Sequence, residues 1–253
     1  MNPVIKVQNV NKSFRVGLQD VQILKNISFE IKQGDFSIIF GPSGCGKSTL
    51  LYALLGLEGP TTGLVTLLDT NLYALASEDE RSEFRKNHIG MVYQQPNWIK
   101  SLTVIENIAF PLLLKGEETL QARTKAQELL KTIQMENWGD YLPSELSSGQ
   151  QQRIALARAL VTNPELIIAD EPTGNLDFES GQTLMQLLQK LNSDAKKTIV
   201  MVTHDLEYLK YAKTAIKMFN GEIEGIYTEK NKSKLIGEVK SKRGIPKTQT
   251  SSE

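Results

Sequence analysis

A glycine-rich segment between two apolar runs constrains this chain more than any other part of its sequence. Residues 41–49 read GPSGCGKST and fit the pattern G-x-x-x-x-G-K-[ST]. Residues 36–40 before it suit a short buried strand, and residues 50–55 after it suit a helix. The glycines let successive N–H groups point into one hollow, where the helix N-terminus adds partial positive charge. The sequence therefore predicts a phosphate-binding loop, in which Lys47 reaches the β- and γ-phosphates and Ser48 places a hydroxyl on Mg²⁺.

The whole loop is expected to surround the phosphates. Its residues are Gly41, Pro42, Ser43, Gly44, Cys45, Gly46, Lys47, Ser48 and Thr49. Cys45 is the single cysteine of the chain, which excludes an internal disulfide. A nearby helix N-terminus favours its thiolate, although a small residue packed inside the loop is the simpler interpretation.

Composition limits the class of protein. The chain has 253 residues, 40% hydrophobic and 23% charged, which is typical of a globular protein with a core. The formal net charge is zero, so there is no general attraction to nucleic acid. No signal segment and no run of about 18 apolar residues is found, so we expect any work at a membrane to depend on another chain.

Strands alternate with helices after the loop, which predicts an α/β fold with a parallel core sheet. The continuous apolar runs 166–169 and 198–202 indicate fully buried strands. Residues 5–10 and 23–31, which precede the loop, alternate at period two and predict an antiparallel pair.

A helical block from about residue 97 to 162 is interpreted as a subdomain inserted between two core strands. Breaks in its helices are expected at Pro111 and Gly116. The block belongs to one domain, residues 1–228. The basic, polar tail at 229–253 is expected to be disordered or loosely attached. A solvated end is the simplest interpretation of the tail, and contact with acidic lipid or a partner is the alternative.

Two adjacent carboxylates end one of the buried strands. Asp170 and Glu171 follow the run Leu166–Ala169, and ligands of open α/β sheets lie at the carboxyl ends of strands. Asp170 is placed to hold Mg²⁺ through water, and Glu171 to accept a proton from a water that attacks the γ-phosphate. A metal ion would offset the repulsion between the two like charges.

Three further features are weaker signals. Ser147 to Gln150 precede a helix, which is an anion site or an ordinary N-cap. His204 follows a buried strand, where it is either a donor to phosphate or a structural residue. Phe14 lies upstream of the loop and is either a platform for a nucleotide base or a core or turn aromatic.

These motifs together resemble an ABC-type ATPase. The resemblance covers roughly residues 4–226 and rests on the order and spacing of GPSGCGKST, Gln94, Leu146–Gln150, LIIADEPTGNLD and His204. PTGNLD, YLPSEL and LTVIEN are most similar to the lipoprotein-releasing and macrolide-export branch. The implied fold is a P-loop core with a parallel sheet, an antiparallel β subdomain and an inserted helical subdomain.

The resemblance implies a role for each motif. Glu171 is the catalytic base, His204 and Lys47 stabilise the γ-phosphate, and Phe14 stacks on adenine. Gln94 contacts Mg²⁺ and the attacking water, and its loop signals to a separate membrane permease. The chain itself is then expected to be cytoplasmic and peripheral on the inner face of the cell membrane. Ser48 and Asp170 complete the magnesium site.

The resemblance also implies a dimer. Ser147, Gly149 and Gln150 bind ATP held by the opposite subunit, so two ATP molecules lie between two chains. Asn175–Asp177 communicate across this interface. A homodimer is expected, with a heterodimer as the alternative.

One position departs from the family pattern. The family signature is usually LSGGQ, whereas this chain has Ser148 at the third position. A side chain there either crowds the approach to the γ-phosphate or fits to one side. We still expect an active ATPase that powers a permease of the exporter or extractor type. A regulatory ATPase of a cell-wall complex is the alternative. Trp98, Ile99 and Phe110 are candidates for the docking surface, and core positions are the alternative for each. A soluble ATPase of ribosomes or DNA is disfavoured, since no second core or coiled coil is present.

Overall fold

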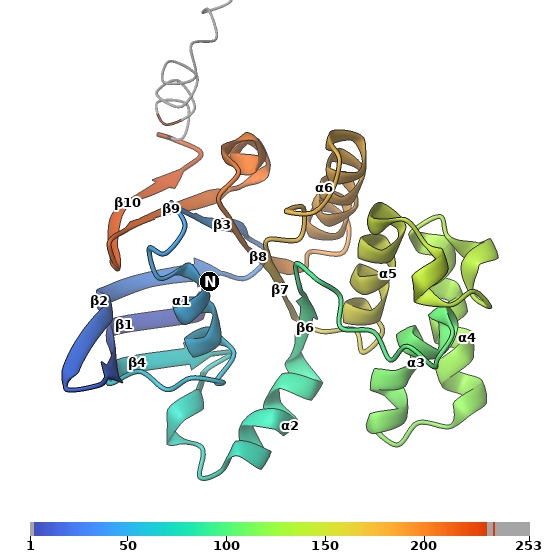
Figure 1. Ribbon diagram of the computed structural model, residues 1–253, viewed down its shortest axis with the longest axis horizontal. Coiled ribbons are helices and arrows are strands. Elements are labelled where there is room, and N and C mark those ends of the chain that lie inside the picture. The colour runs from blue at the N-terminus through green and yellow to red at the C-terminus, as the bar shows by residue number, and fades with distance from the viewer. Residues whose placement is uncertain (1–2, 232–234, 236–253) are drawn as a thin grey trace, which may run out of the picture.

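A six-stranded, mostly parallel sheet forms the centre of the computed structural model, which describes residues 3–231 and 235 (Figure 1). The strand order is β10-β9-β3-β8-β7-β6, and within this sheet of described strands the β10–β9 pairing is antiparallel and the others are parallel. The strands are β3 (Phe36–Phe40), β6 (Ile89–Val92), β7 (Leu166–Asp170), β8 (Thr198–Thr203), β9 (Thr214–Phe219) and β10 (Glu222–Thr228).

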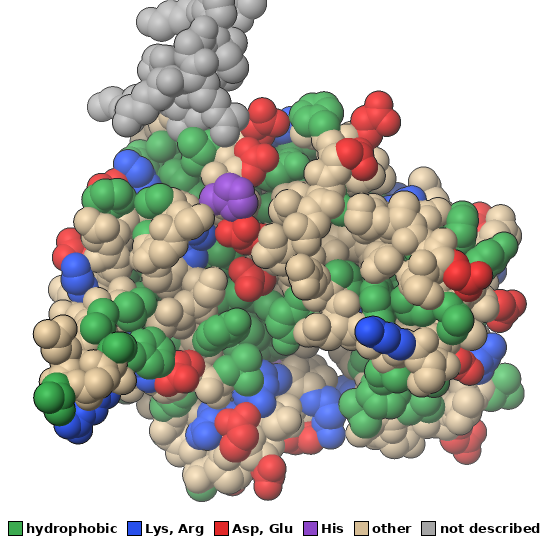
Figure 2. All heavy atoms as spheres, viewed as in Figure 1, with side chains coloured by type: hydrophobic (Ala, Val, Ile, Leu, Met, Phe, Trp, Pro, Cys, Tyr) green, Lys and Arg blue, Asp and Glu red, His purple; other side chains and the backbone are tan. Residues whose placement is uncertain are grey.

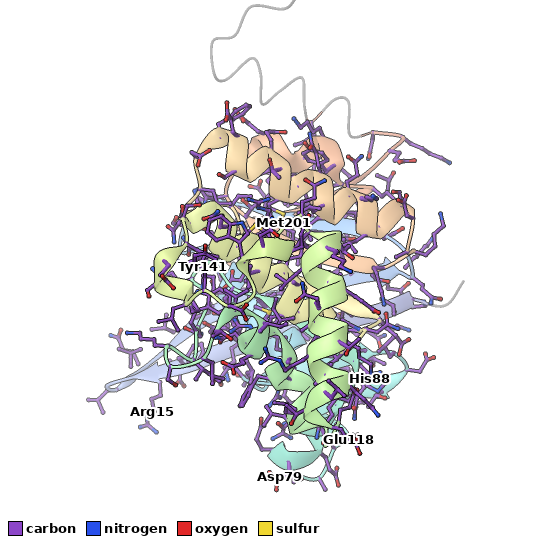
Figure 3. All side chains as sticks on the ribbon, turned by 90° about the vertical axis from the view of Figure 1, so that its right-hand side faces the viewer. Arg15, Asp79, His88, Glu118, Tyr141 and Met201 are labelled. Carbon is purple, nitrogen blue, oxygen red and sulfur yellow. The ribbon has the colours of Figure 1, made fainter. Side chains whose placement is uncertain are left out.

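A separate antiparallel sheet packs on one side of the central sheet. Its order is β2-β1-β4-β5, with β1 (Pro3–Val16), β2 (Gln19–Lys32), β4 (Thr62–Leu67) and β5 (Thr70–Asn71). Pairing of β1 with β4 ends where Asn11 meets Thr62, while pairing with β2 continues to Val16. The outer ends of β1 and β2 therefore form a two-stranded ribbon, and Figure 3 shows Arg15 at its projecting end.

Helices cover both faces of the central sheet and form a group of their own on the right of Figure 1. They are α1 (Lys47–Leu54), α2 (Glu78–His88), α3 (Val104–Leu114), α4 (Thr119–Thr132), α5 (Ser148–Leu160) and α6 (Phe178–Ser193). Short 3₁₀ turns lie at Leu72–Ala74, Glu136–Trp138, Pro143–Glu145 and Leu206–Tyr211.

Alternation along β3 divides the core between the two faces of the central sheet. Ile39 packs in a cluster with α1 and the antiparallel sheet, whereas Phe36 and Ile38 pack in a cluster that includes α5 and α6. A third cluster joins α3, α4 and α5. The phosphate loop is thus anchored by a strand that is fully buried on both faces.

The predicted helix break at Pro111 is wrong, because α3 continues through this residue to Leu114. Proline removes one backbone hydrogen bond from a helix. Ile108 and Leu112 on either side of it are fully buried in the third cluster, and this packing stabilises the helix through Pro111. The break occurs at Gly116, where φ is +83°.

The turn between β9 and β10 is the Asn220-Gly221 turn that the sequence predicts, with positive φ at both residues. In the described part of the chain, no helix combines the length and apolar character needed to cross a bilayer. The predicted disordered tail lies outside the described residues, apart from residues 229–231 and Leu235.

Candidate functional site

The phosphate loop connects β3 to α1 in a conformation that only glycine permits at several points. Gly44 and Gly46 have φ of +77° and +101°. A Cβ at Gly41 would lie 2.2 Å from the Met218 carbonyl oxygen, so the loop passes directly against β9. Gly46 provides no side-chain cap to α1, which leaves the first N–H groups of the helix available to an anion.

Lys47 is 6% exposed, and its ammonium lies at the mouth of the loop. Its Nζ donates to the carbonyl oxygens of Gly41 at 2.9 Å and Pro42 at 3.0 Å. An ammonium has three donors, so one remains for a phosphate. Ser48 is exposed and Thr49 half-buried in the same turn.

Asp170 and Glu171 lie at the carboxyl end of β7, separated from β3 by β8 alone. The pKa of Asp170 is raised above its ordinary value by burial first and by the neighbouring Glu171 second, while Lys47 opposes the increase. Lys47 and Asp170 therefore act on each other across the width of one strand, as a phosphate and metal site requires.

Glu171 has a left-handed backbone, with φ of 44°, which is uncommon for a residue other than glycine. Its N–H donates to the Val202 carbonyl and its own carbonyl accepts from the Gly174 N–H, both at 2.9 Å. These bonds hold the carboxylate toward β8, where Glu171 Oε2 lies 2.9 Å from His204 Nδ1. Figure 2 shows a histidine beside acidic side chains on the face seen there.

Gln94 follows β6, on the other side of β7. A Cβ at Gly174 would lie 2.8 Å from Gln94 Nε2, so the amide rests against the loop that follows Glu171. The ends of four neighbouring strands therefore bring the phosphate loop, Gln94, the two carboxylates and His204 together.

Phe14 lies outside this group, on the ribbon of β1 and β2. Its side chain is 37% exposed and pairs across the ribbon with Val21. Two residues further along β2, the Ile23 carbonyl oxygen lies 3.1 Å from the position that a Cβ of Gly46 would take. Phe14 is thus one strand away from the backbone that supports the phosphate loop. This exposed position does not fit a core aromatic, and a turn aromatic stays the alternative to a platform for the base.

Ser147, Gly149 and Gln150 lie at the start of α5. Ser147 caps the helix, since its Oγ accepts from the Gln150 N–H and the Gln150 side chain accepts from the Ser147 N–H. Gly149 is packed on α6, where a Cβ would lie 2.5 Å from Ser180 Oγ. No hydrogen bond within the described residues joins these three to the phosphate loop.

Asp177 and Lys12 have side-chain contacts that the motifs did not predict. Asp177 caps α6 by accepting from the Ser180 N–H at 2.9 Å, which also holds the pKa of Asp177 below its ordinary value. The D-x-x-S spacing was the available signal. Lys12 lies 4.8 Å from the centre of the Phe14 ring, and no sequence pattern predicted that contact.

A glycine loop between a buried strand and a helix, with a lysine inside it and carboxylates at the end of a nearby strand, defines a P-loop nucleotide-binding protein. Among the residues described, no cluster of three or more His, Cys, Asp or Glu side chains forms a metal cage. The magnesium of such sites is instead held by few protein oxygens together with phosphates and water.

The pattern of the ABC transporter family matches residues 24–174, and this chain belongs to that family. It is 43% identical over 228 residues to the ABC transporter ATP-binding protein MJ0796 of Methanocaldococcus jannaschii, covering 87% of this chain and 95% of the relative. It is 40% identical to the lipoprotein-releasing system ATP-binding protein LolD of Psychrobacter arcticus, covering 88% and 99%.

Solved structures agree with the fold. A dimeric structure of MJ0796 in a post-hydrolysis state, bound to ADP and Pi, has a TM-score of 0.82 at 40% identity and covers 88% of this chain and 98% of its own. CbiO1 of Clostridium perfringens, part of the ABC transporter complex cbiONQ, has a TM-score of 0.84 at 27% identity and covers 97% and 95%. The predicted P-loop core with its antiparallel and helical parts is confirmed as an ABC ATPase fold.

Proposed function

We propose that this chain hydrolyses ATP with Mg²⁺ and thereby drives a separate membrane permease of the exporter or extractor type. The observation that carries the proposal is the Glu171–His204 pair beside a complete phosphate loop. The left-handed backbone of Glu171 is unfavourable for a residue other than glycine, and such strained residues cluster at active sites. The pair therefore supports an active ATPase.

Glu171 serves as general base for the attacking water in this proposal. His204 Nδ1 lies 2.9 Å from Oε2 of this carboxylate, which leaves Oε1 for the water. In its imidazolium form, with a proton on each ring nitrogen, His204 would also donate through Nε2 to the γ-phosphate. Lys47 and the N–H groups of the loop stabilise charge on the phosphates.

The donor set fits magnesium. Ser48 offers an exposed hydroxyl, Asp170 a carboxylate and Gln94 an amide oxygen, which are the hard oxygen ligands that Mg²⁺ takes alongside phosphate and water. The raised pKa of Asp170 is also consistent, because a dication would offset the burial and repulsion that raise it.

A second copy of the chain completes the site. Ser147, Gly149 and Gln150 are a helix N-terminus without a hydrogen bond to their own phosphate loop in the described part of the chain. A two-fold dimer would place each such helix start on the ATP of the other chain. The dimeric structures of MJ0796 support this arrangement.

The permease would dock in a groove between α2, β6 and α3. Ile99 and Phe110 line it, and Leu114 at its rim is 60% exposed. Trp98 is a weaker candidate, since its Nε1 donates to Gln151 Oε1 and Arg158 covers its ring. The groove adjoins the segment that carries Gln94, so docking and the γ-phosphate are linked by a short stretch of chain.

The chain would then lie at the inner face of the cell membrane, peripheral to it. The relatives named as lipoprotein-releasing support an exporter.

Site-directed crosslinking tests the proposal. A photoreactive phenylalanine replaces Phe110 in cells, with the same replacement at Phe219, which is 44% exposed on β9, as the matched control. We expect a membrane protein crosslinked at 110 and not at 219, and Mg-ATP turnover by the purified complex that Glu171→Gln abolishes. Crosslinks to ribosomal proteins, or an assembled complex without turnover, would contradict the proposal.

A further inference from the structure

Lys12 connects Phe14 to the segment that follows α1. The Lys12 ammonium lies 4.8 Å from the centre of the Phe14 ring, pairs with the Glu58 carboxylate and donates to the Gly59 carbonyl oxygen at 2.7 Å. The Lys12 side chain is only 12% exposed, whereas the Glu58 side chain is 41% exposed. The pairing of β1 with β2 changes register on both sides of Lys12, and such irregularities re-aim side chains.

Phe14 requires an anchor of this kind because it lies on the part of β1 that extends beyond the four-stranded sheet. β4 pairs with β1 only as far as Asn11, and a two-stranded ribbon is marginally stable by itself. The ribbon's far end is exposed, with Leu18 at 96%. Without an anchor, the ring of Phe14 would move with the ribbon.

The anchor connects the ring to the phosphate loop through α1. This helix begins at Lys47 in the loop and ends at Leu54, and Glu58 and Gly59 follow shortly after. The Lys12 contacts therefore fix the position of the Phe14 ring relative to the helix that holds the phosphates.

We propose that Lys12 is a positioning residue for nucleotide binding, which holds the Phe14 ring at the distance from the phosphate loop at which it stacks on the base. This inference rests on the proposed function, in which Phe14 is the platform for adenine. The cation covers part of one face of the ring, and the exposed part of the side chain remains for the base.

The test compares a ligand with a base to one without. Binding of ATP and of inorganic tripolyphosphate to the purified full chain is measured by calorimetry for the wild type, Lys12→Met, Lys12→Arg and Phe14→Leu. Lys6→Met is the matched control, since Lys6 pairs with Glu30 on the same two strands away from the ribbon.

We expect Lys12→Met to weaken ATP binding about three- to tenfold and to leave tripolyphosphate binding within about twofold. Lys12→Arg keeps the cation and should retain most of the affinity, and Lys6→Met should change neither ligand. In the Phe14→Leu background, Lys12→Met should add no further loss. If Lys12→Met fails to fold, Glu58→Gln removes the ion pair of the anchor and leaves the Gly59 contact, so it should give a smaller loss with the same selectivity for ATP.

The outcomes separate this inference from the proposed function. Loss of ATP binding in Phe14→Leu with none in Lys12→Met overturns the role of Lys12 and leaves the platform intact. Equal weakening of both ligands by Lys12→Met also overturns it, because the residue then acts on the loop or the fold. Unchanged ATP binding in Phe14→Leu refutes the platform itself.

Discussion

Replacing Asp170 with asparagine should stabilise the nucleotide-free protein and should reduce the additional stabilisation that Mg-ATP provides. Asp170 is half-buried at the end of β7, directly before the Glu171 carboxylate. Burial and Glu171 raise its pKa in the folded protein, and Lys47 offsets only part of this. The folded chain therefore binds more protons than the unfolded chain between the ordinary pKa of aspartate and the raised value. Stability falls as pH rises through this interval, and the full cost remains at neutral pH.

The size of the gain is limited by water. Because the carboxylate is only half-buried, screening keeps the expected gain of Asp170→Asn at about 1 kcal/mol or less. For a chain of this size, this corresponds to an increase in Tm of at most about 4 °C. With ATP at 100 times its Kd, the wild type gains about 2.7 kcal/mol from binding. The variant should gain clearly less with Mg-ATP, because it lacks the carboxylate that we propose holds the metal.

Thermal unfolding at neutral pH, with and without Mg-ATP, measures both effects. Asp140→Asn at an exposed aspartate is the control and should behave as wild type. At acidic pH, where Asp170 itself becomes protonated, the advantage of the variant should shrink. The reasoning is refuted if Asp170→Asn lowers the Tm of the nucleotide-free protein, or if it retains the full stabilisation by Mg-ATP.

Three other predictions concern the packing, one helix cap and the loop. Glu106 accepts two hydrogen bonds from Thr103, which lower its pKa, so Glu106→Gln should cost about 0.5 kcal/mol in urea unfolding at neutral pH and nothing below the lowered pKa. Gly90→Ala would place a Cβ 2.3 Å from the Ala159 carbonyl oxygen and should cost about 2 kcal/mol, and an unchanged midpoint would contradict this. Cys45 is 4% exposed, so alkylation should be slow, should be slowed further by ATP and should abolish nucleotide binding. Unchanged ATP affinity after complete labelling would refute the last prediction.

The loop and the core strands could be predicted because local sequence determines them. GPSGCGKST requires a turn that only glycines form, and the apolar runs of β3, β7 and β8 fit only a sheet buried on both faces. Most of the candidate site was therefore within reach of the sequence, although the roles of its residues stay predictions.

The remainder depends on contacts between distant segments. Pro111 predicts a helix break from local chemistry, but burial of Ile108 and Leu112 decides otherwise. Residues 147–150 were expected to precede a helix, but the helix already starts at Ser148, because Ser147 is its N-cap and a capping serine and an anion site look alike in sequence. The contact of Lys12 with Phe14 and Glu58 joins residues that no spacing rule connects.

The central claim is that Glu171 is the base of a site completed by a second chain. The most direct test measures the mass of the purified Glu171→Gln variant in solution, with and without Mg-ATP, alongside its ATP turnover. The account predicts a monomer that becomes a stable dimer with ATP, and turnover about 10² to 10⁴ times slower than that of the wild type. A variant that stays monomeric with ATP bound, or that hydrolyses ATP at the wild-type rate, would contradict it.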